Sequence, residues 1–313
     1  MQQHIPVLLK ETLEILSPQA GDRILDVTLG LGGHSEALLE AAGKAGSLVA
    51  LDADMENIAI AKENLKKFGS RVTILHSNFS ELPNCLPEDQ RQFDIILADL
   101  GLSSPHIDDP TRGFTFRTDA PLDMRFDRSS GMTAAMLLAS LDEEKLRKIF
   151  WEFGELPKVR PLVTEIVARR TENPIRSSSD LTDAAKVVYG YKSPQMLPQL
   201  FQALRMAVNR EREALGNLLA AIPFLLAPGG RCAVIAYHSI EDTLVKTAFR
   251  SLAADEKDLL TGSISKKSEF VLLTRKPIAA SEQEIQKNPR SRSARLRAIA
   301  KRTEYTDHRT ASC

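Results

Sequence analysis

Short, nearly continuous apolar segments alternate with amphipathic ones through the first hundred residues. The apolar segments have the character of strands buried on both faces of a parallel sheet, and they are residues 24–29, 47–52, 72–77 and 93–99. Between them, residues 34–44 and 55–68 show helical spacing, and the second of these segments ends in Lys66, Lys67 and then Gly69, a typical helix stop. The alternation predicts a βαβαβαβ order, which is typical of a doubly wound, mostly parallel α/β sheet.

The pattern changes after residue 108. Residues 108–131 are dense in Asp, Arg, Gly and Pro without periodicity, which indicates a long ordered loop or a lid. Apolar residues then recur at helical spacing in the predicted helices 133–141, 142–153, 159–172, 179–188 and 196–219. Strand-like segments return at residues 228–239 and 270–276. We therefore predict one discontinuous α/β domain, residues 1–108 and 205–313, interrupted by an all-helical subdomain, residues 109–204.

Composition places the chain among globular proteins, with 43% hydrophobic and 26% charged residues. The formal net charge is zero, so any polyanion site has to come from a local cluster of charge. Cys85, Cys232 and Cys313 form neither a disulfide framework nor a metal-ligand spacing, which favours a reducing compartment. No apolar stretch is long enough for a signal peptide or a membrane span, so we expect a cytoplasmic protein without a membrane partner.

The sequence DVTLGLGGHS, residues 26–35, places three glycines after the first predicted strand. Glycine adopts positive φ and lets a ligand approach the backbone closely. Three interpretations fit: a tight strand-to-helix turn that binds nothing, a nicotinamide dinucleotide site, and a site for S-adenosylmethionine. The dinucleotide pattern G-x-G-x-x-G begins at Gly30 and Gly32 but has Ser35 in place of its third glycine.

Acidic residues at the ends of the predicted strands favour the third interpretation. Asp52 ends the second strand, where a carboxylate accepts hydrogen bonds from ribose hydroxyls, which both cofactors carry. Asp26 and Asp99 end neighbouring strands, where their charge repels a pyrophosphate but attracts a sulfonium. We therefore predict a cationic, ribose-bearing methyl donor, S-adenosylmethionine, and no metal ion.

The sequence DLGLSSPH, residues 99–106, follows the fourth predicted strand. Methyl transfer to an exocyclic amine requires acceptors for the N–H groups of that amine, and Asp99 with nearby carbonyls is a candidate set. Ser104 is a further substrate-side candidate. The same Ser-Ser-Pro sequence is also typical of a turn without any chemical role.

The sequence AYHSIED, residues 236–242, leaves the fifth predicted strand. His238 is a candidate to orient a base or to accept a proton, while Glu241 and Asp242 suit the N-terminus of the following helix. An isolated histidine such as His238 or His34 is more often structural than catalytic, so both interpretations stay open.

Seven basic residues and no acid lie between positions 287 and 302, and they are Lys287, Arg290, Arg292, Arg295, Arg297, Lys301 and Arg302. Such a concentration in a chain of zero net charge is typical of a phosphate-binding stripe. A solvated, partly disordered basic tail is the alternative. Arg169, Arg170 and Arg176 in the predicted insert are candidates to extend the stripe.

With these motifs in order, the chain resembles the bacterial 16S ribosomal RNA cytosine-N4 methyltransferase family, the RsmH (MraW) type. The resemblance covers nearly the whole chain and is carried by HIPVLL, DVTLGLGGHS, DLGLSSPHIDDPTRGFTFRTDAPLDMRFD, FQALRMAVN, APGGRCAVIAYHSIED and NPRSRSARLR. It implies a Rossmann-like class I methyltransferase fold whose helical insert recognises the substrate. It also implies methyl transfer from S-adenosylmethionine to the N4 amine of a cytidine in the decoding region of 16S rRNA, in the small ribosomal subunit.

The resemblance further implies that the donor is bound by Gly32, Gly33, His34, Asp52, Phe79, Asp99 and His106. The family usually has glutamine in place of His106, ATRT in place of residues 197–200, and a Glu-Arg pair in place of Leu156 and Pro157. A histidine at position 106 still donates or accepts a hydrogen bond, but its charge varies near neutral pH. A nicotinamide-dependent oxidoreductase and a non-catalytic ribosome-assembly protein remain alternatives, and the oligomeric state is open.

Overall fold

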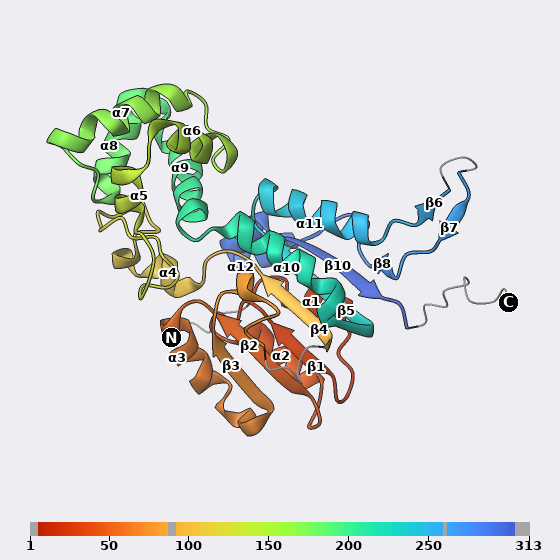
Figure 1. Ribbon diagram of the computed structural model, residues 1–313. Coiled ribbons are helices and arrows are strands. Elements are labelled where there is room, and N and C mark those ends of the chain that lie inside the picture. The colour runs from red at the N-terminus through yellow and green to blue at the C-terminus, as the bar shows by residue number, and fades with distance from the viewer. Residues whose placement is uncertain (1–5, 87–91, 259–261, 304–313) are drawn as a thin grey trace. The chain divides into compact units, whose positions relative to one another are not determined.

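The computed structural model describes residues 6–86, 92–258 and 262–303 (Figure 1). The chain forms two compact units, Met1–Gly101 with Glu213–Cys313, and Leu102–Arg212. The second unit is thus wider at both ends than the insert expected at residues 109–204. Cys313 and the first two residues of HIPVLL lie outside the described residues. Among the residues described, no helix is both long and apolar enough to cross a membrane.

The first unit is built around a sheet with the strand order β3-β2-β1-β4-β5-β10-β8, in which β9 also pairs with β10. Strands β1 to β5 are parallel to their neighbours, whereas β10 is antiparallel to β5 and β8. The strands are β1 (Arg23–Asp26), β2 (Ser47–Asp52), β3 (Val72–His76), β4 (Phe93–Asp99), β5 (Leu226–Ala236), β8 (Phe270–Leu272), β9 (Ile278–Ala279) and β10 (Arg295–Lys301). The predicted α/β class with a mostly parallel sheet is confirmed.

Both faces of this sheet are covered, which explains the continuous apolar segments in strands such as β2 and β4. Leu48 and Ala50 of β2 belong to one hydrophobic cluster, while Val49 and Leu51 belong to the other, since neighbouring strand residues point to opposite faces. The first cluster includes residues of α1 (Leu9–Leu16), α2 (Gly33–Ala41) and α3 (Met55–Asn64). The second cluster includes residues of α10 (Glu211–Leu225) and α11 (Ser239–Leu252). A short helix, α12 (Glu282–Lys287), and a separate hairpin of β6 (Glu256–Lys257) and β7 (Ile264–Lys266) complete the unit.

The second unit, whose residues are all described, contains helices and a single isolated β-bridge, between Pro121 and Ser177. Asp142 and Ser177 cap two of its helices by accepting backbone N–H groups of the first turn. Apolar residues at helical spacing form its core. The helices are α4 (Ser104–Asp108), α5 (Ala134–Ser140), α6 (Glu143–Glu152), α7 (Val159–Glu172), α8 (Ser178–Tyr189) and α9 (Ser193–Val208).

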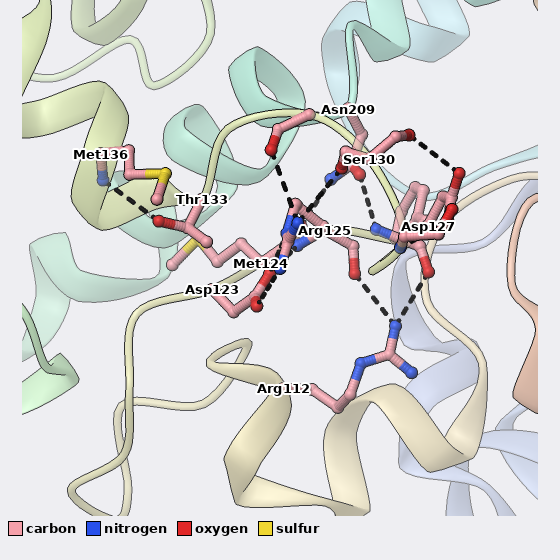
Figure 2. A network of polar contacts seen from close by, with 12 residues as sticks. Arg112, Asp123, Met124, Arg125, Asp127, Ser130, Thr133, Met136 and Asn209 are labelled. Carbon is pink, nitrogen blue, oxygen red and sulfur yellow. Dashed lines mark hydrogen bonds and ion pairs between the residues drawn. The ribbon is translucent and has the colours of Figure 1, made fainter.

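The segment predicted as a long ordered loop, residues 108–131, folds around one buried arginine. Arg112 is 1% exposed, and its Nη2 donates to the carbonyls of Arg125 and Phe126 at 3.0 and 3.1 Å. Figure 2 shows that the side chain of Asn209 lies against the same turn. Its Oδ1 accepts from Phe126 N at 2.8 Å, and its Nδ2 donates to Met124 O at 2.7 Å. Side chains therefore supply the hydrogen bonds that regular secondary structure would supply elsewhere.

Two predictions about the chain after the insert are wrong. The predicted helix 196–219 is two helices, because α9 ends at Val208 and α10 begins at Glu211. Asn209 turns its amide to the loop described above, and Arg210 takes a left-handed φ of 49°, which no helix continues. Residues 295–301, predicted to be part of a basic stripe or tail, form the buried strand β10 instead.

Candidate functional site

The turn after β1 is held by a buried aspartate. Asp26, 1% exposed, accepts from Ser35 Oγ at 2.7 Å and from Thr28 N at 3.0 Å. Burial raises the pKa of Asp26, while these hydrogen bonds act in the opposite direction. Within the turn, Gly30 and Gly32 adopt φ values of 52° and 86°, a region that favours glycine. Asp26 thus anchors both ends of a turn that only small, flexible residues can form.

The carboxylate of Asp52 closes the same turn from the end of β2. Its Oδ2 accepts from Gly30 N at 2.7 Å, and its Oδ1 accepts from Asp54 N at 2.8 Å. Burial raises the pKa of Asp52 to about 6 despite these two hydrogen bonds. Each carboxylate oxygen accepts more than one hydrogen bond, so a fixed Asp52 can still receive hydroxyl donors.

Asp99, at the end of β4, is surrounded by polar groups from three other segments. Tyr237 Oη donates to its Oδ1 at 2.8 Å, His34 Nε2 lies 3.6 Å from its Oδ2, and its own N–H donates to Thr28 Oγ1 at 2.6 Å. Burial raises the pKa of Asp99 to about 7, and the nearby carboxylates Asp26 and Glu241 raise it further, against the hydrogen bond from Tyr237. This carboxyl group therefore changes charge near neutral pH.

The register of the sheet places these three carboxylates at one edge. Asp26 pairs with Ala50 of β2 and with Leu97 of β4, so Asp52 and Asp99 each lie two residues further toward the carboxyl ends. In doubly wound sheets, ligands bind outside the carboxyl ends, where the strand order reverses. The reversal here lies between β1 and β4, beside all three acids.

A model of the MraW methylase family matches residues 1–302. The chain belongs to the MraW methylase family. A protein named ribosomal RNA small subunit methyltransferase H from Heliobacterium mobile is 42% identical to it, over 95% of this chain and 98% of that protein. A protein of the same name from Thermomicrobium roseum is also 42% identical, over 94% of this chain and 92% of its own length. TrmN from Thermus thermophilus superposes with a TM-score of 0.43 at 14% identity, covering 94% of this chain and 48% of its own, which adds nothing to the assignment.

In this MraW methylase, the glycines expected under the donor differ in what surrounds them. A Cβ on Gly33 would lie 2.5 Å from Pro6 Cγ, and one on Gly32 would lie 3.3 Å from Leu65 Cγ, so both glycines are needed for packing. The atom nearest to a Cβ on Gly30 is Thr28 O, at 3.9 Å. A Cβ on Gly30 would therefore make only an ordinary packing contact.

Phe79 follows β3 in the short helix η2 (Phe79–Glu81). It is half-buried and packs against the hydrophobic cluster that contains Val49 and Leu51 of β2. Asn78 accepts from Ser80 N at 2.9 Å and thereby fixes the turn that carries Phe79. The aromatic ring is thus held against the core of the first unit.

Ser104 and His106 belong to the helical unit, in α4. His106 is 4% exposed, and its Nδ1 lies 3.2 Å from Ser103 N, the donor it caps. Its ring packs against Phe114 and Phe126, with ring centroids 5.2 Å apart in both pairs. These contacts give His106 a structural role in its own unit, and its predicted role in donor binding stays a prediction.

His238 serves as the N-cap of α11, since its Nδ1 accepts from Glu241 N at 3.4 Å. Glu241 and Asp242 lie in the first turn of this helix, as expected, but their side chains have other partners. Glu241 Oε2 accepts from Tyr237 N at 2.9 Å, and Asp242 pairs with Arg297. Tyr237, which donates to Asp99, is the site residue that the sequence reasoning missed. Its place next to His238, at the end of a predicted strand, was the available signal.

These residues fit a cationic, ribose-bearing methyl donor. Asp52 is a fixed acceptor at the tip of β2, and the hydrogen bond from Gly30 N holds it next to the glycine turn. The acids Asp26 and Asp99 make the edge unfavourable for a pyrophosphate and favourable for a positive charge.

Proposed function

We propose that this protein is an S-adenosylmethionine-dependent methyltransferase that modifies the N4 amine of a cytidine in the decoding region of 16S rRNA, in the cytoplasm. Membership in the MraW methylase family and the names of its relatives support an enzyme acting on small-subunit rRNA. The observation that carries the proposal is the edge formed by Asp26, Asp52 and Asp99. It joins a ribose acceptor to a carboxylate that titrates near pH 7.

When bound, S-adenosylmethionine supplies a methyl group on a positively charged sulfur. Asp52 would accept hydrogen bonds from its ribose hydroxyls, the turn from Gly30 to His34 would border the methionine part, and Phe79 would pack near the adenine. Asp99, when ionised, would attract the sulfonium charge and accept an N–H of the target amine, which would align the nitrogen lone pair. The methylated amine would then lose its proton to a weak base or to water.

The substrate base has to leave its stack to reach such a site, at a cost of a few kcal/mol. We assign recognition of the surrounding RNA to the helical unit, residues 102–212. Exposed cations of the basic run, such as Lys287 and Arg292, supply phosphate contacts in addition. The roles of Ser104, His106 and His238 beside donor or substrate remain predictions.

The test is incubation with a methyl-labelled donor and either 16S rRNA or isolated small subunits, followed by mass spectrometry of the nucleosides. We expect N4-methylcytidine, and we expect Asp99→Ala to abolish it while the protein stays folded. RNA binding without any transfer by the wild-type protein would favour the ribosome-assembly alternative. Calorimetry with S-adenosylhomocysteine and with NAD distinguishes the oxidoreductase alternative, which requires tighter binding of the dinucleotide.

A further inference from the structure

Tyr237 connects the end of β5 to Asp99 and is fixed at both of its ends. Its backbone N–H donates to Glu241 Oε2 at 2.9 Å, and its hydroxyl donates to Asp99 Oδ1 at 2.8 Å. The two partners come from different elements, since Asp99 ends β4 and Glu241 lies in the first turn of α11. The tyrosine thus has little freedom to move away from the carboxylate.

A glycine lies beside this contact. Gly101 follows β4 and has a φ of 103°, a conformation that side chains rarely adopt. A Cβ at this position would lie 3.4 Å from Cδ2 of the Tyr237 ring, an ordinary packing distance. The turn that follows Asp99 therefore runs directly beside the ring, and its backbone conformation favours glycine.

The phenol in this position is a hydrogen-bond donor. Burial raises the pKa of Tyr237 well above its usual value, and the Asp99 carboxylate adds to this effect, so the hydroxyl keeps its proton. A donated hydrogen bond favours the ionised form of Asp99, whereas burial and the carboxylates of Asp26 and Glu241 favour the protonated form. Among the residues that the structure describes, His34 also faces Asp99, with its Nε2 3.6 Å from Oδ2.

We propose that Tyr237 is a positioning residue for the methyl transfer: its hydroxyl fixes the Asp99 carboxylate and favours the ionised form of that carboxylate over the protonated one. The contacts of Asp99 with the sulfonium and the target amine rest on the function proposed above, whereas the control of Asp99 by Tyr237 rests on the geometry alone. The two parts fail separately and are tested separately.

The direct test is a carboxyl ¹³C NMR titration of aspartate-labelled protein without any ligand. In Tyr237→Phe the ring remains and only the donor is lost, so we expect the pKa of Asp99 to rise by about one unit. Tyr189→Phe is the matched control, because Tyr189 Oη donates to Pro157 O at 2.8 Å in the other unit. An unchanged Asp99 titration in Tyr237→Phe would overturn the proposal.

The second measurement compares the affinities for S-adenosylmethionine and S-adenosylhomocysteine, which differ in the charge on sulfur. We expect the preference for the charged ligand to fall about threefold to tenfold in Tyr237→Phe at pH 7, and to recover above pH 8.5 as Asp99 ionises. A loss of the same size at every pH indicates a merely structural role and contradicts the proposal. In the Asp99→Asn background, Tyr237→Phe should change the preference no further.

A substitution with the opposite effect covers the case in which Tyr237→Phe does not fold. The chain has four tyrosines, and biosynthetic replacement by 3-fluorotyrosine makes every phenol a stronger donor without removing any. We expect the pKa of Asp99 to fall, and an unchanged or higher value would overturn the proposal. If the wild-type protein methylates no RNA, the function proposed above fails, while both titrations still decide whether Tyr237 controls Asp99.

Discussion

Arg297 and Asp242 form a two-pronged ion pair, with Nε to Oδ1 at 2.7 Å and Nη2 to Oδ2 at 2.9 Å. Arg297 lies on β10 and is 7% exposed, and Asp242 lies in the first turn of α11. The pair joins an interior strand of the sheet to a helix that covers it. A guanidinium held in this way stabilises the fold and is not available to phosphate groups.

Asp242→Asn should therefore destabilise the protein although the change is conservative. Removing one partner leaves a buried, uncompensated charge, and we expect a loss of about 2 to 4 kcal/mol in the free energy of unfolding. Urea unfolding followed by circular dichroism measures it. The double variant Arg297→Met with Asp242→Leu removes both charges and should recover much of the loss. A double variant no more stable than Asp242→Asn would show that the ion pair is not the cause.

The strands that the sequence predicted are those with continuous apolar composition. β2 and β4 have the predicted bounds, and the acids that end β1, β2 and β4 follow from the same pattern. β10 was missed because it contains Arg295, Arg297 and Lys301, which made the segment resemble a basic surface. Two of its cations have partners distant in sequence: the buried Arg297 pairs with Asp242, and Lys301 Nζ donates to Pro223 O at 2.9 Å. Such pairing is a property of the fold and leaves no local signal.

Contacts between distant residues also limited what the sequence could predict of the candidate site. The aspartates were found because strand ends in a parallel sheet meet at one edge. Tyr237 was not found, since its contact with Asp99 joins positions 138 residues apart. Likewise, nothing in the sequence around Arg112 shows that this arginine is buried or that Asn209 shares its loop.

Arg112→Lys should loosen the loop of the helical unit. Both hydrogen bonds come from Nη2, and the side chain of lysine is one bond shorter, so its ammonium does not reach both carbonyls. Two buried carbonyls then lose a partner, and we expect about 3 kcal/mol of destabilisation. Hydrogen exchange of residues 112–130 measures the local effect. Arg117→Lys, an exposed change in the same segment, is the control and should leave exchange unchanged. Equal protection in both variants would contradict the structural role of Arg112.

Asp52→Asn should weaken donor binding at least about tenfold, measured by calorimetry with S-adenosylhomocysteine. The two carboxylate oxygens of Asp52 accept the backbone N–H groups of Gly30 and Asp54. In the asparagine variant, the NH₂ group replaces one of these oxygens and faces an N–H donor, so one hydrogen bond is lost. Asp54→Asn is the matched control. It removes the same charge two residues away, and asparagine retains the N-cap that Asp54 provides for α3. If both variants bind alike, Asp52 is not the ribose acceptor.

Asp99→Asn should stabilise the ligand-free protein at alkaline pH while abolishing transfer. The pKa of Asp99 is about 7 when folded, against 3.8 for the ordinary group, so the folded state binds more protons than the unfolded state between these values. The contribution of Asp99 to the free energy of unfolding therefore falls as the pH rises through that window. Asparagine carries no charge and still accepts from Tyr237. We expect the advantage of the variant, measured by thermal unfolding, to grow by about 2 kcal/mol between pH 5 and pH 8.

The remaining prediction concerns the part of the basic run that stays at the surface. Deleting residues 287–313 would remove β10, so loss of RNA binding in that truncation would report unfolding. Lys287 and Arg292 are exposed, and replacing both by glutamine changes charge without touching the sheet. If each contacts a phosphate, the slope of log affinity for 16S rRNA against log salt should decrease in magnitude by about 1.4 to 1.8, at 0.7 to 0.9 per contact. Lys44→Gln with Lys62→Gln removes two exposed charges elsewhere and should leave the slope unchanged. Equal slopes for both pairs would mean that the run contributes only general charge and no RNA contact of its own.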